Sequence, residues 1–512
     1  MKPPIAVSMS SLWLRWLQLG FRHLLVASVL LPIVARARVT FDGNQQNVNV
    51  GAQAVGSSSL TISLPFTIAA NTKVGSIAVL TTGIAGLDFA RAKGGTCKAM
   101  TYTTVTNCKL NVSFAPQASG LRSGAVVFYS GARSTSTVLA LVPVLGIGTG
   151  PQLAFGPDGA QSSVGGKLIS PEGVAVDAGG NVYVTDIALQ EVLKVTPGGS
   201  RTTVGSGLEV PAGVAVDGAG NVYIADSQVP AVFKVTPGGV QTTVGNGFDW
   251  PSGVAVDGKG NVYVSDPFID AVYKITPGGK QTTVGSGYNT PAGVAVDVAG
   301  NVYVADSFNA TVYEITPGGT QTTVGSGFIT PAAVAVDAAG DVYITDAGAD
   351  AVYLVTPAGV QTTVTSRLNV PNGVAIDGSG NLYLANTYNE QILKVDRADA
   401  PSLKFAPTKV GSTSEDSPKT VEIKNIGNTA LTFSSLTYPA DFPEYSGGVN
   451  DCTSGTSLEA ASTCALSIDF SPVKSLGSKD SRSFKEAVKL TTNTLNVLNT
   501  LEQVTVTGKE TK

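Results

Sequence analysis

A nearly constant motif recurs six times in this 512-residue chain, at an interval of 40 residues. Its third copy reads PSGVAVDGKGNVYVSDPFIDAVYKITPGGKQTTVGSG. Every copy opens on a proline, and these are Pro171, Pro211, Pro251, Pro291, Pro331 and Pro371. A fixed period of this length is typical of repeat architectures, in which each copy is one supersecondary unit that packs on its neighbours. The repeat therefore restricts the possible folds more than any other feature of the sequence.

Each copy contains three short runs in which apolar and polar residues alternate, followed by a fourth, more polar run. In the first copy these runs span residues 173–177, 181–186, 191–195 and 201–205. They are rich in Val, Ile, Tyr and Thr, and Gly, Pro and Asp separate them, which is typical of strands joined by tight turns. Four strands in 40 residues indicate one blade of a β-propeller.

The strand count also predicts how the ring closes. The sixth copy has only three strands and ends at residues 391–395, whereas a fourth-strand sequence, AQSSVG, precedes the first copy at 160–165. We expect the last blade to take its outer strand from the N-terminal side, because this pairing leaves no exposed blade edge.

The regions on either side of the repeats resemble each other. Cys108 begins CKLNVSFAP, and Cys464 begins CALSIDFSP. Both regions read as all-β modules, so the predicted fold class is all-β, with a six-bladed β-propeller between two β-sandwiches. The predicted domains are residues 1–37 (signal peptide), 38–150 (sandwich), 151–400 (propeller) and 401–512 (sandwich).

The N-terminus has the features of an export signal. Arg15 and Arg22 precede an apolar stretch at 24–34, and Ala35-Arg36-Ala37 supplies a cleavage motif. The apolar stretch is too short for a comfortable membrane span. We expect a secreted, periplasmic or envelope-associated protein with no membrane span after cleavage; an uncleaved anchor is the alternative.

Four cysteines form two close pairs, one on each side of the repeats. In an exported protein the spacing of Cys97 with Cys108 and of Cys452 with Cys464 predicts two disulfides. Each would stabilise its module by about 3 kcal/mol in the chain-entropy model. A zinc site is the alternative, although the chain has no C-x-x-C motif.

Cleavage after residue 37 would remove the only histidine, His23, and four basic residues. The remainder has 29 basic and 37 acidic residues, a net charge of −8. An acidic surface argues against nucleic acid and anionic lipid as partners. A chain without histidine has no Ser-His-Asp triad and no histidine general base.

The two faces of the predicted disc differ. The turns after the first and third strands, such as DGKGN and TPGG, are nearly constant; we call this side the constant face. The Asp of each such turn, Asp177 in the first copy, is expected to cap the bend. The Asp closing each second strand, Asp186 in the first copy, is expected to accept hydrogen bonds from loop amides.

The loops after the second and fourth strands vary, and we call their side the variable face. The first residue of each loop before a repeat proline is always large and apolar, and is expected to plug the blade. The candidate ligand-binding residues are Glu209, Asp249, Trp250, Phe268, Asn289, Phe308, Asn369 and Tyr388. A rigid scaffold with one variable loop face is typical of a binding platform. Neutral drift of the loops is the alternative.

The unit with P-x-G-V-A-V-D, G-N-V-Y-V-x-D and T-P-G-G resembles the NHL-repeat propellers. The flanking modules look like Hydin-type (choice-of-anchor D-like) immunoglobulin-like domains, on the motifs N-x-G-N-x-x-L at 425–431 and C-x-L-x-I-x-F-x-P. The N-terminal module lacks the N-x-G-N motif. The resemblance implies a propeller of a bacterial envelope protein.

Several propeller enzymes are also similar in outline. The peptidyl-amidating lyases and streptogramin B lyases use histidine, whereas gluconolactonase-like propellers hold calcium or zinc in the channel with Glu, Asn and Asp. Glu172 and Asn372 follow repeat prolines of adjacent blades and are expected to touch. Two ligands are too few for an oxygen-lined metal site, which usually has six or more. We therefore expect no catalytic residue, metal or cofactor, with calcium at this pair as the alternative.

These observations favour an exported, non-catalytic interaction protein whose propeller binds a protein, a peptide or a glycan such as a polysaccharide through the variable face. A metal-dependent lactonase-like or lyase-like enzyme is the first alternative. A structural adhesion or assembly protein of the cell envelope is the second.

Overall fold

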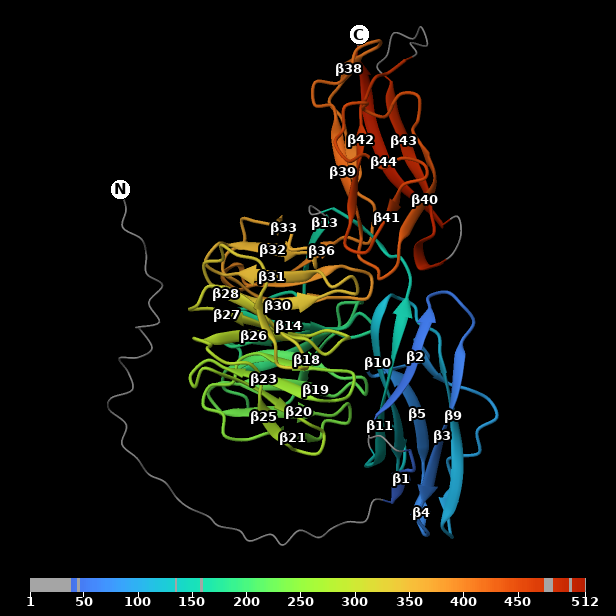
Figure 1. Ribbon diagram of the computed structural model, residues 1–512, viewed down its shortest axis with the longest axis vertical. Helices are drawn as coiled ribbons and strands as arrows, with labels where there is room; N and C mark the ends of the chain where they lie inside the picture. The colour runs from blue at the N-terminus through green and yellow to red at the C-terminus, as the bar shows by residue number, and fades with distance from the viewer. Residues whose placement is uncertain are drawn as a thin grey trace, which may run out of the picture. The chain divides into compact units, whose positions relative to one another are not determined.

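The computed structural model describes residues 38–43, 47–133, 136–156, 160–473, 482–496 and 500–511 (Figure 1). The predicted signal peptide, residues 1–37, lies outside this part. The described chain is all-β, as predicted, apart from two short 3-10 helices, η1 (Thr387–Asn389) and η2 (Thr494–Asn496). Within the described residues, no helix has the length and apolar character needed to span a membrane.

Six four-stranded antiparallel sheets form the six blades of a β-propeller. The first strands of the blades are β14 (Pro171–Val176), β18 (Pro211–Val216), β22 (Val254–Val256), β26 (Pro291–Val296), β30 (Pro331–Val336) and β34 (Pro371–Ile376). The second strands are β15 (Val182–Asp186), β19 (Val222–Asp226), β23 (Val262–Asp266), β27 (Val302–Asp306), β31 (Val342–Asp346) and β35 (Leu382–Asn386). The first strands of neighbouring blades contact one another, and β34 contacts β14, so the ring is closed.

The outer half of each blade consists of its third and fourth strands. The third strands are β16 (Glu191–Val195), β20 (Ala231–Val235), β24 (Ala271–Ile275), β28 (Thr311–Ile315), β32 (Ala351–Val355) and β36 (Gln391–Asp396). The fourth strands of the first five blades are β17 (Arg201–Val204), β21 (Gln241–Val244), β25 (Gln281–Thr283), β29 (Gln321–Thr323) and β33 (Gln361–Thr365). These outer strands are more exposed than the second strands, as their polar sequences require.

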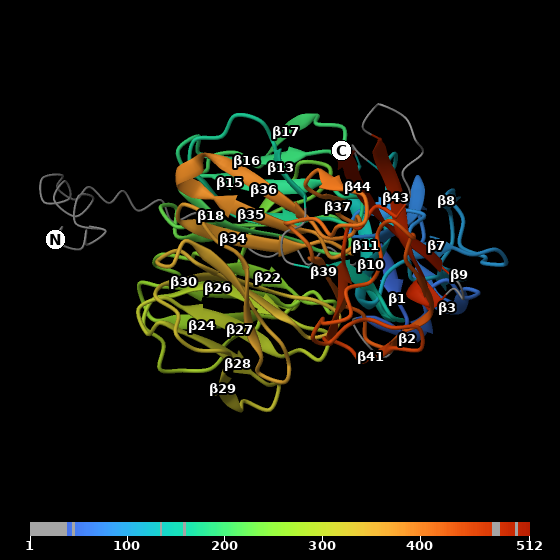
Figure 2. The same cartoon turned by 90° about the horizontal axis from the view of Figure 1, so that it is seen from above.

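The sixth blade is completed by a strand from the other end of the repeat region. Its sheet order is β13-β36-β35-β34, where β13 (Ala160–Val164) precedes the first repeat (Figure 2). Ala160 pairs with Asp396 and Val164 with Ile392. The predicted ring closure is therefore confirmed.

The propeller core lies between blades. All five residues of every second strand are buried, because each second strand is covered by the sheets on both sides. One core cluster, for example, joins Tyr183 and Val192 of the first blade to Leu208, Val214 and Ile224 of the second. The predicted plug residues are buried in every blade, and these are Leu168, Leu208, Phe248, Tyr288, Phe328 and Leu368.

Close approach of the first strands explains the glycine of the P-x-G motif. A Cβ atom on Gly173 would lie 2.5 Å from the carbonyl oxygen of Ala212, and one on Gly373 would lie 2.5 Å from that of Glu172. Both oxygens belong to the neighbouring blade's backbone, which has little freedom to move. The fifth blade has Ala333 at this position.

The N-terminal module consists of two sheets that share one core. One sheet has the order β1-β3-β9-β7 and the other β2-β11-β10-β5-β6. Their strands are β1 (Val39–Phe41), β2 (Val48–Ala54), β3 (Leu60–Ile68), β5 (Ser76–Thr81), β6 (Ile84–Ala85), β7 (Phe89–Arg91), β9 (Thr106–Phe114), β10 (Gly120–Tyr129) and β11 (Val138–Thr149). A short pair, β4 (Thr72–Lys73) with β8 (Thr101–Tyr102), lies beside them. Phe66 and Phe114 of one sheet pack in a common core with Val126 and Phe128 of the other.

The C-terminal module has two sheets as well. The first has the order β12-β39-β42, and the second β37-β44-β43-β40-β41 with β38 on β44. Their strands are β12 (Leu153–Phe155), β37 (Ser402–Lys404), β38 (Thr408–Lys409), β39 (Lys419–Asn425), β40 (Leu431–Thr437), β41 (Ser457–Leu458), β42 (Thr463–Ile468), β43 (Ser483–Thr492) and β44 (Thr500–Thr511). The strand β12 lies before the propeller in the chain, yet it pairs with β39, so the chain enters the C-terminal module before it forms the propeller. The domain boundaries stay predictions.

Both predicted disulfides are present, Cys97–Cys108 and Cys452–Cys464. The described residues include no free cysteine. Disulfides form and persist in oxidising environments, so this pairing indicates a location outside the cytoplasm.

The constant face packs against the N-terminal module. The amide of Gly83 donates a hydrogen bond to the carbonyl oxygen of Gly218, at 3.1 Å, in the turn of the second blade. A Cβ atom on Gly218 would lie 2.5 Å from the carbonyl oxygen of Gly124 in β10, and one on Gly258 would lie 3.2 Å from Cβ of Leu145 in β11. The constant turns are therefore both tight bends and a contact surface.

The fifth blade departs from the repeat at this contact. Five copies have Asn after the turn glycine, whereas the fifth has Asp341. Its carboxylate is 3.0 Å from Nζ of Lys424 in β39, and both side chains are buried, at 0% and 4% exposure. Burial raises the pKa of Asp341, and the Lys424 ammonium opposes that rise. The pair is a buried ion pair between the propeller and the C-terminal module.

We expect Gly173→Ala to destabilise the protein by about 1–3 kcal/mol, because the added methyl group clashes with the backbone of the next blade. Urea unfolding at equilibrium measures the change. Ala333→Gly is the matched control in the fifth blade and should cost only about 0.5–1 kcal/mol. Equal stabilities of Gly173→Ala and the wild type would contradict this account of the motif.

We expect Lys424→Ala to cost about 3–5 kcal/mol, because it leaves the Asp341 carboxylate buried without its partner. The double substitution Lys424→Met with Asp341→Asn removes both charges and restores the residue of the other copies. It should recover most of that loss, as measured by the same unfolding experiment. A double variant as unstable as Lys424→Ala would show that the pair is not the source of the effect.

Candidate functional site

The carboxylate that closes each second strand organises the loops of the variable face. Asp186 accepts hydrogen bonds from the amides of Ile169 and Ser170, at 2.8 and 3.1 Å, and from those of Ala188 and Leu189, both at 3.2 Å. Asp226 makes the same four contacts one blade later. Asn386 replaces the Asp in the sixth blade and accepts one such bond. The predicted structural role of these residues is confirmed.

The constant-face aspartates have a structural role too. Asp177 accepts bonds from the amides of Gly179 and Asn181, from the Asn181 side chain and from the Tyr183 hydroxyl. The Asp177 carboxylate is buried, and these contacts hold it against the turn. These carboxylates are therefore occupied within their own turns.

The candidate binding residues all lie on loops of the variable face, as predicted. The aromatic side chains among them are exposed, with Trp250 at 40%, Phe268 at 59%, Phe308 at 67% and Tyr388 at 63%. Four polar candidates accompany them: Glu209, Asp249 and Asn289 are exposed, and Asn369 is half-buried. Ligand binding by these residues stays a prediction.

The backbone under the polar candidates is fixed by the same blade framework. The amide of Glu209 donates to Asp226, and that of Asp249 to Asp266, each at 2.8 Å. The amide of Asn289 donates to Asp306 at 2.9 Å. The loops therefore present variable side chains from a rigid backbone, which keeps the conformational cost of binding low.

Glu172 and Asn372 touch, as predicted. The Asn372 side-chain amide donates to Oε2 of Glu172 at 2.9 Å and to Oγ1 of Thr387 at 3.1 Å. Burial of the carboxyl raises the pKa of Glu172 to about 7, and the bond from Asn372 opposes the rise. Among the described residues, no group of three or more His, Cys, Asp or Glu side chains is placed to hold a metal ion. Whether the pair binds calcium, or the chain needs no cofactor, stays an open prediction.

Sequence reasoning missed Thr387 as the third member of this group. Its hydroxyl donates to the carbonyl oxygen of Pro171 at 2.6 Å, so it links the sixth blade to the first. The equivalent residue is Ser227 in the second blade and Ser307 in the fourth, and each donates to the carbonyl oxygen of a repeat proline, Pro251 or Pro331. A Ser or Thr directly after the residue that closes the second strand recurs in three blades, and this recurrence could have identified Thr387 from the sequence.

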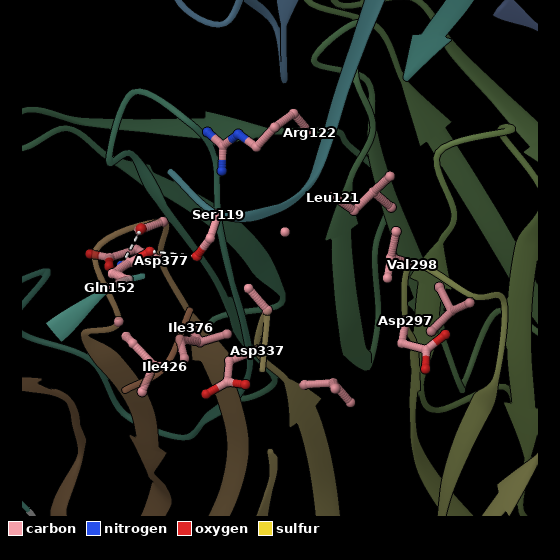
Figure 3. Close-up of a pocket in the computed structure, with 16 residues that line it drawn as sticks. Ser119, Leu121, Arg122, Gln152, Asp297, Val298, Asp337, Ile376, Asp377 and Ile426 are labelled. Atoms are coloured by element: carbon pink, nitrogen blue, oxygen red, sulfur yellow. Dashed lines mark hydrogen bonds between the residues drawn. The ribbon is translucent and has the colours of Figure 1, made fainter. Parts of the chain in front are cut away.

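A cavity of about 250 Å³ lies on the constant side, between turns of the propeller and both flanking modules (Figure 3). Polar groups at its wall already have partners. Arg122 forms a 2.7 Å ion pair with Asp88, Ser119 donates to Gln152 at 2.9 Å, and Gln152 donates to the carbonyl oxygen of Gly378 at 2.8 Å. The cavity therefore reads as a gap in a contact surface, and the variable face is the better candidate site.

Comparison with solved structures finds similar propellers. The virginiamycin B lyase of Staphylococcus aureus is 14% identical over 48% of this chain and 99% of that chain, with a TM-score of 0.39. A gluconolactonase of Xanthomonas campestris is 16% identical over 48% of this chain and 95% of that chain, with a TM-score of 0.43. A chain of a nidogen/laminin complex is 21% identical over 48% and 90%, with a TM-score of 0.36.

No family model matches the sequence, and no curated protein matches it either. The expectation that this chain is not an enzyme is wrong as a deduction from its fold and composition, because the similar propellers include a lyase and a gluconolactonase. Because their identity to this chain is low, the likeness shows the fold alone and assigns no reaction to this chain. Similar propellers thus occur in enzymes and in a protein–protein complex.

We expect Glu172→Gln to change how stability depends on pH. A carboxyl whose pKa rises from 4.5 to about 7 on folding stabilises the protein fully below pH 4.5, and this contribution is lost as the pH rises through 7. The variant keeps an acceptor for Asn372 but does not titrate. Relative to the wild type, its free energy of unfolding should therefore improve between pH 5 and pH 8, as measured by urea unfolding. A constant difference between the two proteins across this range would contradict the raised pKa.

Proposed function

We propose that this protein is an exported ligand-binding propeller that holds a protein, peptide or glycan on its variable face. One observation carries the proposal: four exposed aromatic side chains lie on loops of the variable face, whereas the opposite face packs against the flanking modules. Aromatic residues are the side chains that most often dominate binding energy.

The finer assignments belong to the same proposal. The 40-residue motif supports an NHL-type propeller. The strands CKLNVSFAP and CALSIDFSP support Hydin-type immunoglobulin-like modules on either side. The two disulfides support export, through a signal peptide at 1–37, to the periplasm, the cell envelope or the medium. The flanking modules then hold the propeller by its constant face.

The charge of the variable face narrows the class of ligand. Its exposed loop residues include five carboxylates, Glu209, Asp249, Asp270, Asp350 and Glu390. Two exposed cations, Lys167 and Arg367, accompany them. An acidic face repels polyanions, so the proposed ligand is neutral or basic and is not a nucleic acid.

A second candidate function is acid–base catalysis at the Glu172–Asn372 pair, favoured by the contact between the two side chains and by the pKa of about 7 at Glu172. A carboxyl with a pKa near the working pH exchanges a proton readily with a bound substrate. Lactone hydrolysis by the wild type and its loss in Glu172→Gln would support this function. Equal rates in both proteins would remove it.

We expect the double variant Trp250→Ala with Asp249→Ala to lose binding by at least tenfold, because it removes the bulk of one patch of the variable face. The measurement is binding of the full chain to an array of neutral glycans and basic peptides. The control is Val240→Ala, which removes a side chain of 61% exposure from a constant turn and should leave binding unchanged. Loss of binding in the control, or no binding by the wild type, would contradict the assignment of Trp250 and Asp249 to a ligand-binding site.

A further inference from the structure

Two loop clusters on the variable face match each other residue by residue at an interval of 80 residues. The first lies across the third and fourth blades and contains Asp270, Asn289, Thr290, Phe308 and Asn309. The second lies across the fifth and sixth blades and contains Asp350, Asn369, Val370, Tyr388 and Asn389. We call them subsite 1 and subsite 2. The same positions of the other blades do not carry this set of Asp, two Asn and an aromatic ring.

The hydrogen bonds that backbone amides donate within the two subsites are the same. The Asp carboxylate accepts a hydrogen bond from the amide of Thr290 at 2.8 Å in subsite 1, and from that of Val370 at 2.9 Å in subsite 2. The amide of Phe308 donates to the carbonyl oxygen of Asn289 at 3.2 Å. The amide of Tyr388 likewise donates to the carbonyl oxygen of Asn369 at 3.2 Å. Each subsite therefore joins the loops of two adjacent blades.

Both subsites hold a β-branched residue in the left-handed region of backbone space, Thr290 with φ 61° and Val370 with φ 52°. Such a conformation costs on the order of 1–3 kcal/mol per residue. In four other blades the equivalent amide donates to the Asp that closes its own blade, and these residues are Ser170, Val210, Trp250 and Thr330. The two subsites depart from this pattern in the same way.

The likeness is confined to the subsites. The third and fifth blades, which lie at the same interval, differ at the corresponding loop positions: Phe268 and Ile269 in one correspond to Gly348 and Ala349 in the other. Trp250 likewise corresponds to Thr330. Copying of a whole two-blade unit would have made these positions alike as well, so it does not explain the match.

The side chains of each subsite suit a sugar ring. Phe308 and Tyr388 are 67% and 63% exposed, which leaves each ring free to stack on the C–H face of a sugar. Side-chain amides both donate and accept hydrogen bonds, as hydroxyl groups do, and each subsite has two of them. Asn309 is anchored to Asp306 at 2.8 Å, and Asn369 donates to Asn389 at 3.4 Å. The single carboxylate of each subsite disfavours an anionic sugar.

We propose that subsites 1 and 2 are equivalent sugar-binding sites, and that together they hold two units of one neutral polysaccharide. This inference rests on the proposed function and specifies its ligand. Two blades out of six separate the subsites, so they lie a third of the ring apart. One long chain that reaches both gains affinity by avidity, whereas a sugar that fills only one subsite does not.

The test is affinity electrophoresis of the full chain in gels that contain a neutral polysaccharide, namely β-1,3-glucan, xylan or mannan. The wild type should be retarded by at least one of them. Phe308→Ala and Tyr388→Ala should each lower the apparent affinity for that polysaccharide by about 100-fold. Each variant keeps only one working subsite and therefore loses the gain from avidity. The double variant should migrate as in a gel without polysaccharide. Val240→Ala and Val360→Ala, on constant turns, should behave as the wild type.

The outcomes separate this inference from the proposed function. If Trp250→Ala with Asp249→Ala abolishes retardation while Phe308→Ala with Tyr388→Ala does not, the variable face binds its ligand without the two subsites, and the inference is overturned. It is also overturned if a basic peptide binds and none of the polysaccharides does. If no probe is bound by the wild type, both fail.

Discussion

Burial of the second strands between adjacent blades is the interaction on which the rest of the structure depends. Each second strand is covered on both sides, so no blade has a complete core of its own. Each blade therefore relies on its neighbours for its core, and the ring closes where β34 contacts β14 and where β13 pairs with β36 across the two ends of the repeat region. In the closed ring the first strands of neighbouring blades approach one another closely around the axis. This is why there is no room for a side chain at Gly173 and Gly373.

The closed ring gives the two faces different roles. The constant turns are rigid, rich in glycine and flat enough for the backbone of the N-terminal module to approach Gly218 closely. A buried ion pair, Asp341 with Lys424, links the fifth blade to the C-terminal module at the same side. Such a pair contributes little net stability, because desolvation offsets most of its Coulomb energy. The variable face is left for a ligand.

Much of the candidate site was predictable, because it follows from strand periodicity. Loops after the second and fourth strands must lie on the same side of every blade, so the sequence alone places Trp250, Phe268 and Tyr388 on one face. Contact between Glu172 and Asn372 was predictable for the same reason, since both follow a repeat proline in adjacent blades. The raised pKa of Glu172 was not, because it depends on how deeply the fold buries that carboxyl.

The sequence by itself determined the blades, the strand that closes the ring, the pairing of the four cysteines and the division into two faces. Each depends on residues close in the chain or on a regular period. The tertiary structure alone decided which face is covered, why Asp341 departs from the repeat, and how the amides of Thr290 and Val370 turn to a neighbouring blade. These features depend on contacts between residues far apart in sequence, and no local pattern encodes such contacts.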